Sequence, residues 1–468
     1  MVRVRIASLA VMVFLVLAVL SAHAQSYHSA QYPPTLANPL GGRVQTSACA
    51  LDRNPVNVTV GNTYLVGFNT LSLAETPQVP LLVGFDPSGF RTWYENPDLG
   101  SGSATAVVVD SQGYILVATT AGMVYRVAPP QPQQPQLQPV VVGSFNLGGI
   151  ANRMVLDTAD NLYITGYTGN RTAIYTHRLN RTTGGYVPAT GWPQSVAGSN
   201  AAGNAIAVRN GSVYVAGTAD RGLGTFGDGA ALRFAGTGGA PLAQYWHDGT
   251  NGNSSGTDVF NDLAVDASGN VYVTGTTDAT IDLYASDYVT VRLNAGSLAL
   301  GWAQTLSGSE LFRPRKTSVD SALFLALDPL EQNVYVAGNL MNAGVGGIQT
   351  FKYSATGNLL GAAPWINNSS VSGLFVSSTG QVFVGGVTGT SALLLAYPSS
   401  LAGPTLGTPV YLDMATLPNG LAGTAPAISC LLGRNTSGNP PLFAGGSYKI
   451  TSPSGPPLRA IGIQWVNP

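Results

Sequence analysis

Charged side chains are scarce in this chain of 468 residues, since Asp, Glu, Lys and Arg make up only 9% of it. The 21 basic and 22 acidic residues nearly cancel, and the sequence pI is about 6.4. Coiled coils need charged heptads and disordered tails need net charge, so both classes are excluded. A nucleic-acid-binding protein needs a basic surface for phosphates. We therefore expect no nucleic-acid partner.

Histidine and cysteine are rarer still, with four and two residues. No two histidines after residue 24 lie at metal-ligand spacing. The chain also lacks the motifs of phosphate-binding loops, zinc proteases and serine hydrolases. We therefore expect neither a metal nor a cofactor, and motifs identify no catalytic residue.

Long apolar runs are absent apart from residues 6–20, which follow two arginines and precede Ala22-His-Ala24. This run is shorter than the roughly 20 residues that a membrane-spanning helix needs. The pattern predicts a cleaved secretory signal over residues 1–24, with an uncleaved anchor as the alternative. We expect a secreted or periplasmic monomer that is not inserted into a membrane.

Glycine is abundant, with 58 residues, and it recurs within a repeated unit. The unit is an apolar triplet, Asp or a substitute, a Gly/Asn turn, an aromatic residue, two β-formers and a small residue. Its clearest copy is Leu-Ala-Val-Asp-Ala-Ser-Gly-Asn-Val-Tyr-Val-Thr-Gly at 263–275. The eight aromatic positions are 48 to 63 residues apart, and they are Tyr64, Tyr114, Tyr163, Tyr214, Tyr272, Tyr335, Phe383 and Phe443.

Each copy predicts a strand, a tight turn and a second strand, and a third and often a fourth strand pattern follow. Four antiparallel strands per repeat are typical of a propeller blade. The sequence thus predicts an all-β propeller of eight four-stranded blades over residues 48–468, with seven blades as the alternative. The last repeat ends after its third strand, so we expect residues 25–47 to supply the missing outer strand.

The middle repeats resemble the bacterial β-propeller repeat called SBBP. The resemblance rests on the copy at 263–275, on the following Val291-Arg-Leu-Asn294 and on Trp302. It covers most of residues 48–466 and weakens at both ends. It implies a secreted or surface-exposed bacterial propeller, and it implies no reaction, since such repeats define a scaffold.

The two cysteines occupy the same position of the first and last repeats, three residues before the Asp position. These repeats become neighbours only if the ring closes. The sequence therefore predicts a disulfide between Cys49 and Cys430, with two buried free thiols as the alternative.

Polar residues lie four or five residues before the Asp position in several repeats, where the chain leads into the innermost strand. Thr105 is the first of them. Equivalent positions in a propeller gather around the axis, so these side chains are expected to converge at the mouth of the ring. The predicted ligand-binding residues are Asn152, Arg153, Asn204, Asn261 and Asp262. The alternative is that the amides only cap loops and solvate the channel.

Two functions follow from this pattern. The first is a non-catalytic scaffold that binds glycans or a surface protein partner. The second is a polysaccharide lyase or hydrolase that uses Arg153, Asp262 and His247 at the mouth, where a base would need a perturbed pKa beside a charge stabiliser. A polar loop, residues 249–258, follows His247 and offers a further place for a ligand, with a plain surface loop as the alternative. His177, in a third-strand pattern, is expected to be a half-exposed strand residue.

Overall fold

The computed structural model describes residues 29–32, 44–52, 61–70, 78–85, 91–95, 98–129, 139–222, 227–249, 257–278, 286–306, 320–342, 345–389, 391–401, 410–412, 423–433, 442–450 and 458–466. All helix or strand elements in these ranges are strands, so the all-β prediction is confirmed. The predicted signal, residues 1–24, lies outside them.

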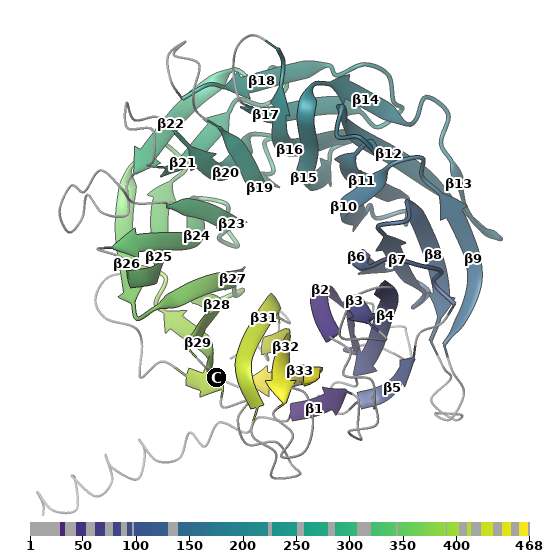
Figure 1. The fold of residues 1–468 in the computed structure, drawn as a ribbon. Helices are drawn as coiled ribbons and strands as arrows, with labels where there is room; N and C mark the ends of the chain where they lie inside the picture. The colour runs from purple at the N-terminus through teal and green to yellow at the C-terminus, as the bar shows by residue number, and fades with distance from the viewer. Residues whose placement is uncertain are drawn as a thin grey trace, which may run out of the picture.

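The strands form antiparallel sheets that stand around a central axis as propeller blades (Figure 1). Each sheet places one strand nearest the axis, and these innermost strands are β2 (Val44–Leu51), β6 (Ala104–Val109), β10 (Ile150–Leu156), β15 (Ser199–Arg209), β19 (Val259–Val265), β23 (Ser321–Leu327), β27 (Ser369–Val376) and β31 (Gly423–Gly433). The second strands are β3 (Thr63–Thr70), β7 (Ile115–Thr119), β11 (Leu162–Tyr167), β16 (Ser212–Asp220), β20 (Val271–Thr277), β24 (Asn333–Asn342), β28 (Val382–Thr388) and β32 (Leu442–Ile450).

The remaining strands lie farther from the axis. The third strands are β4 (Gln78–Phe85), β8 (Met123–Ala128), β12 (Ala173–Thr182), β17 (Asp228–Ala235), β21 (Asp287–Leu293), β25 (Val345–Ser354), β29 (Ser391–Tyr397) and β33 (Leu458–Val466). The outer strands are β5 (Arg91–Glu95), β9 (Val140–Asn146), β13 (Gly185–Pro188), β14 (Gln194–Ala197), β18 (Ala243–His247), β22 (Leu300–Leu306), β26 (Leu359–Ile366), β30 (Val410–Leu412) and β1 (Ser29–Tyr32).

The sheets are not equivalent units, and this corrects the prediction of eight four-stranded blades in favour of the alternative of seven. Among the described strands, seven blades are each built from consecutive strands, from β2–β5 to β27–β30. The remaining sheet is a composite, because it joins β31–β33 from one end of the chain to β1 from the other. In it, β1 runs antiparallel to β33, with Ser29 opposite Gln464 and Tyr32 opposite Ile461.

One of the seven blades also departs from the predicted strand number, since it has five strands. Its long third strand β12 pairs with β13 near one end and with β14 near the other. Pro188 ends β13, and Pro193 immediately precedes β14. Proline has no N–H to donate to a sheet, so a continuous outer strand is interrupted here.

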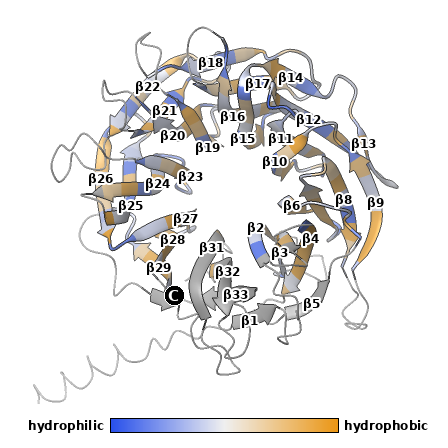
Figure 2. Cartoon of the chain, in the orientation of Figure 1, coloured by the Kyte–Doolittle hydropathy of each residue, from blue (hydrophilic) through white to orange (hydrophobic). Residues whose placement is uncertain are grey.

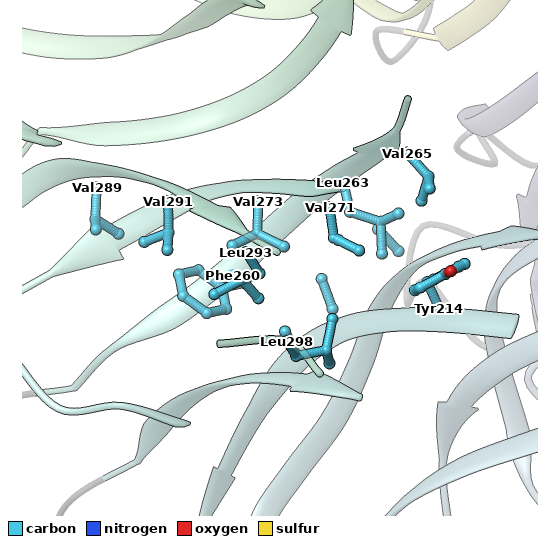
Figure 3. Close-up of a cluster of buried hydrophobic side chains, with 13 residues drawn as sticks. Tyr214, Phe260, Leu263, Val265, Val271, Val273, Val289, Val291, Leu293 and Leu298 are labelled. Carbon is cyan, nitrogen blue, oxygen red and sulfur yellow. The ribbon is translucent and has the colours of Figure 1, made fainter. Parts of the chain in front are cut away.

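The hydrophobic core lies between neighbouring blades. In one cluster, Tyr214 of β16 packs with Phe260 and Leu263 of β19 and with Val273 of β20, and all four are at most 8% exposed (Figure 3). Another cluster joins Leu116 of β7 to residues of β10–β12 in the same way. Each blade is therefore stabilised mainly by the blades beside it.

On the outside, β9 carries exposed Val140 and Val142 (Figure 2).

The Asp of the repeated unit organises the turn between the first two strands. Asp266 Oδ1 accepts the backbone N–H of Asn270 at 2.9 Å, and Oδ2 accepts the Asn270 side chain at 2.8 Å. Gly269, at φ +85°, takes the left-handed backbone conformation in which other residues are strained. The carboxylate is therefore used as an acceptor within its own turn.

The predicted disulfide is confirmed, since Cys49 on β2 is bonded to Cys430 on β31, with 6.1 Å between their Cα atoms. The bond links the first consecutive blade to the composite sheet. In the part of the chain described above, no helix is long and apolar enough to span a membrane.

Candidate functional site

The predicted mouth residues lie on innermost strands, at irregularities in their pairing. The pairing register shifts between Ala151 and Arg153 on β10, and equivalent shifts occur on β15 and β19. Each shift leaves one residue without a partner across the sheet, which is a β-bulge. The bulged residues are Asn152, Asn204 and Asn261.

Glycine on the second strand makes room for each bulge. A Cβ atom on Gly275 would lie 1.8 Å from the carbonyl oxygen of Val259, and one on Gly166 would lie 1.9 Å from that of Ile150. No side chain fits at such distances. The small residue that ends the repeated unit is therefore required by the close approach of the innermost strand.

The three bulged asparagines hydrogen-bond to the next blade. Asn152 Nδ2 donates to the Gly203 carbonyl at 3.0 Å, Asn204 Nδ2 to Phe260 at 3.0 Å and Asn261 Nδ2 to Ala322 at 2.8 Å. Each acceptor immediately precedes the bulged position of the following innermost strand, so the contact repeats from blade to blade. These amide nitrogens thus contribute to blade–blade association. Thr105 differs, because its hydroxyl donates to Ala118 in its own blade at 3.4 Å.

The two charged residues predicted at the mouth, Arg153 and Asp262, differ from the bulged asparagines in their environment. Arg153 is exposed on β10. Asp262 on β19 accepts the N–H of Leu325 in the next blade and that of Leu263, both at 2.9 Å. Burial raises the pKa of Asp262 to about 6, although the positive charge of Arg153 acts to lower it. The two charges therefore interact even though β15 separates their strands around the ring.

The structure does not bring His247 to these residues. His247 ends the outer strand β18, where Tyr245 OH lies 3.3 Å from its Nδ1. Its ring centroid is 5.8 Å from that of Phe260, between two blades. Burial lowers the pKa of His247, while the carboxylate of Asp258 opposes this shift. The acidic groups that act on it are Asp258, Asp248 and Asp228, and Asp262 is not among them.

Residues 250–256, in the loop after His247, lie outside the described ranges. At its ends, Asp258 is 2% exposed and accepts the N–H groups of Gly249 at 2.8 Å and Asp278 at 3.3 Å. Burial raises the pKa of Asp258. This carboxylate ties the ends of two surface loops together.

His177 was expected to be half-exposed, and this is wrong because it is 2% exposed. It points into the space between blades, where Phe145 and Tyr175 meet its ring edge-on at 5.5 and 6.0 Å. Its Nδ1 accepts the N–H of Arg178 at 2.9 Å. Burial lowers the pKa of His177 to about 4.

The sequence interpretation missed a second set of contacts between blades, made by basic residues of the third strands. Arg178 lies opposite the aromatic Tyr163 and donates to the Gly236 carbonyl of the next blade at 2.5 Å. Lys352 lies opposite Tyr335 and donates to Ser399 at 2.9 Å. The signal in the sequence is a basic residue on the third strand after four of the aromatic positions, and variable loop lengths obscure its spacing.

Metal ligands do not gather in the described residues. No group of three or more His, Cys, Asp or Glu side chains there could hold an ion. The Asp residues of the turns instead accept hydrogen bonds from their own backbone, as at Asp266.

Comparisons with known proteins define the fold and not the activity. No known protein family and no curated protein matches the chain in sequence. Among solved structures, the Dos1 propeller is 12% identical over 91% of this chain and 93% of its own, with a TM-score of 0.55. Sqt1 from Chaetomium thermophilum is 12% identical over 93% of this chain and 99% of its own, with a TM-score of 0.56.

A quinohemoprotein alcohol dehydrogenase, ADHIIG from Pseudomonas putida HK5, is also similar in structure. It is 10% identical over 92% of this chain and 76% of its own, with a TM-score of 0.52. These likenesses show that the protein is a β-propeller. At such low identity they carry no information on substrate or reaction.

Proposed function

We propose that the protein is a non-catalytic β-propeller scaffold that binds a hydroxyl-rich or carboxylate-bearing ligand, such as a glycan, at the mouth of the ring. The observation that carries this proposal is the placement of Arg153 and Asp262 on the innermost strands β10 and β19, where the positive charge of Arg153 acts to lower the pKa of Asp262. A guanidinium and a carboxyl group on these innermost strands supply both donors and acceptors. The bulged asparagines support the mouth by fixing neighbouring blades, since their amide nitrogens are already bonded.

A lyase or hydrolase is the second candidate, and the raised pKa of Asp262, to about 6, is the observation that favours it. A carboxylate with such a pKa beside a cation could act as a general base near neutral pH. The predicted third participant, His247, lies on an outer strand with different acidic neighbours. Binding without catalysis is therefore the simpler function.

The protein is proposed to act outside the cytoplasm. The pattern of residues 1–24 predicts export, and the Cys49–Cys430 disulfide is typical of an oxidising compartment. Membership of the SBBP repeat family is part of the same proposal and rests on the repeated unit. Ligands would then be extracellular or periplasmic polymers.

The proposal is tested by thermal unfolding of the purified protein with carboxylate-bearing oligosaccharides. A ligand at a hundred times its Kd adds about 2.7 kcal/mol to stability, which gives a measurable rise in Tm. Arg153→Ala and Asp262→Asn should abolish the rise, and Arg153→Lys should retain part of it. Arg171→Asn is a matched control, since Arg171 is an exposed arginine in the β11–β12 turn.

Three outcomes separate the candidates. A rise in Tm that is lost in the mouth variants, with no release of reducing ends, supports the scaffold. Release of reducing ends that Asp262→Asn abolishes supports the enzyme instead. A rise that survives both mouth variants would overturn the assignment of the ligand site to the mouth.

A further inference from the structure

A second concave site lies on the outside of the propeller, away from the mouth. It is a hollow of about 640 Å³ between the outer strands β14 and β18 of neighbouring blades. Small-molecule sites have volumes of roughly 300–1,000 Å³, so it is large enough for one or two sugar rings. Its polar lining includes Thr172, Ser199, Asp220, Arg221 and Gln244, with Trp246 as its aromatic member.

Two neighbouring residues, Asp228 and Trp246, hold the positively charged guanidinium of Arg221 in this hollow. Arg221 Nε donates to Asp228 at 2.6 Å, and Asp228 is 1% exposed, whereas the Arg221 side chain is 32% exposed. The guanidinium carbon lies 4.7 Å from the centre of the Trp246 ring. In the described residues, no further hydrogen bond of Arg221 is found, so its terminal nitrogens can donate to a ligand without a loss of existing bonds.

The other polar side chains are also fixed. Asp220 accepts the Ser199 hydroxyl at 3.0 Å and the Gly222 N–H at 2.7 Å. Gln244 Oε1 accepts the indole N–H of Trp246 at 3.2 Å, which leaves the amide nitrogen of Gln244 as a donor. Groups that are already ordered lose little entropy when a ligand binds, so the hollow is preorganised.

The chemistry of these groups selects the ligand class. Asp220 disfavours an anionic ligand, and Arg221 disfavours a cationic one. Trp246 packs on the blade core, with the guanidinium of Arg221 over its ring. A hydroxyl group both donates and accepts, which matches the mixture of carboxylate, guanidinium and amide. We propose that the hollow between β14 and β18 is a second binding site, specific for neutral oligosaccharides.

The test is titration of the purified protein with neutral hexose, pentose and N-acetylhexosamine oligosaccharides, followed by calorimetry and by ligand-observed NMR. Loss of one hydrogen bond to a charged group weakens binding by about tenfold or more. We expect this loss for Asp220→Asn, and a loss of about fivefold for Gln244→Ala, because the Gln244 amide is neutral. Arg221 is left unchanged, because its removal would leave Asp228 buried without its partner.

Two controls separate this site from the mouth. Asp98→Asn is the matched control, because Asp98 is an exposed carboxylate that also accepts the N–H of a glycine two residues later, Gly100. It should bind as the unchanged protein does. Arg153→Ala should leave binding to the hollow intact, even if the function proposed for the mouth is wrong.

Four results would overturn the inference. Measured in the Arg153→Ala variant, they are no binding of any neutral oligosaccharide at millimolar concentration, binding that Asp220→Asn and Gln244→Ala leave unchanged, preference for galacturonate oligomers, and binding of unstructured peptides in place of sugars. Circular dichroism and Tm of each variant establish that a loss of binding is not a loss of fold.

Discussion

Cys49 on β2 and Cys430 on β31 are bonded, although 381 residues separate them in the sequence. Their Cα atoms are 6.1 Å apart, within the usual range for a disulfide. The bond joins the first consecutive blade to the composite sheet that contains both chain ends. It therefore acts at the point where the ring is closed.

Removal of this disulfide should lower stability strongly. The chain-entropy estimate for a loop of this length gives at most about 6 kcal/mol. Cys49→Ala, Cys430→Ala and the double variant should lose the same amount, because each removes the same bond. Chemical denaturation with and without reductant measures the loss. Equal stability of oxidised and reduced protein would contradict the prediction.

The bulged asparagines should contribute to stability whether or not a ligand binds. Asn204→Ala removes the donor to Phe260 and should cost about 1 kcal/mol of unfolding free energy. Asn204→Asp should cost at least as much, since it keeps the shape and lacks the donor. Urea denaturation measures both. No change in either variant would show that the contact between blades is not stabilising.

Acid should destabilise the fold through His177. Burial lowers its pKa to about 4, whereas an unfolded histidine titrates near 6.5. The stability from neutral His177 is therefore present above about pH 6.5 and is lost as the pH falls toward 4, up to about 3 kcal/mol.

The effect is measured by the pH dependence of urea unfolding between neutral pH and about pH 4. His177→Gln cannot take up a proton and should show a smaller fall in stability over this range, even if its stability at neutral pH is lower. Parallel pH profiles for the two proteins would rule out His177 as the cause.

Strand β1 should stabilise the composite sheet by pairing with β33. Deletion of residues 29–32 exposes the edge of β33 that β1 covers, so the Tm should fall by a few degrees. Deletion of residues 34–37 is the control, because it shortens the same segment and keeps β1. Differential scanning calorimetry compares the two, and an equal Tm for both would count against a fastening role.

Sequence patterns identified the polar residues of the predicted mouth, but they did not predict the hydrogen bonds that these residues make. The amides of Asn152, Asn204 and Asn261 stand at equivalent positions, as the repeat predicted. Their donation to the next blade depends on bulges, and a bulge is a property of paired strands that one strand does not reveal. The amide of Asn261 could therefore not be assigned to Ala322, 61 residues later.

Two other features show what the sequence patterns did not predict. The third-strand residues Arg178 and Lys352 escaped notice because loops of different length shift them relative to the aromatic positions. His177 looked half-exposed because its strand alternates, yet the neighbouring blade covers that face. The burial of a side chain between blades depends on how the neighbouring blade packs, which the alternation of a single strand does not show.

The sequence by itself determined the all-β fold, the repeated blades and the partner of each cysteine, because turn chemistry and strand periodicity are local and repeat along the chain. Tertiary structure alone decided that β12 pairs with two outer strands and that Arg221, Asp220 and Gln244 share a hollow. These relations depend on how strands pair and how their side chains pack together, which the residue pattern of a single strand does not show.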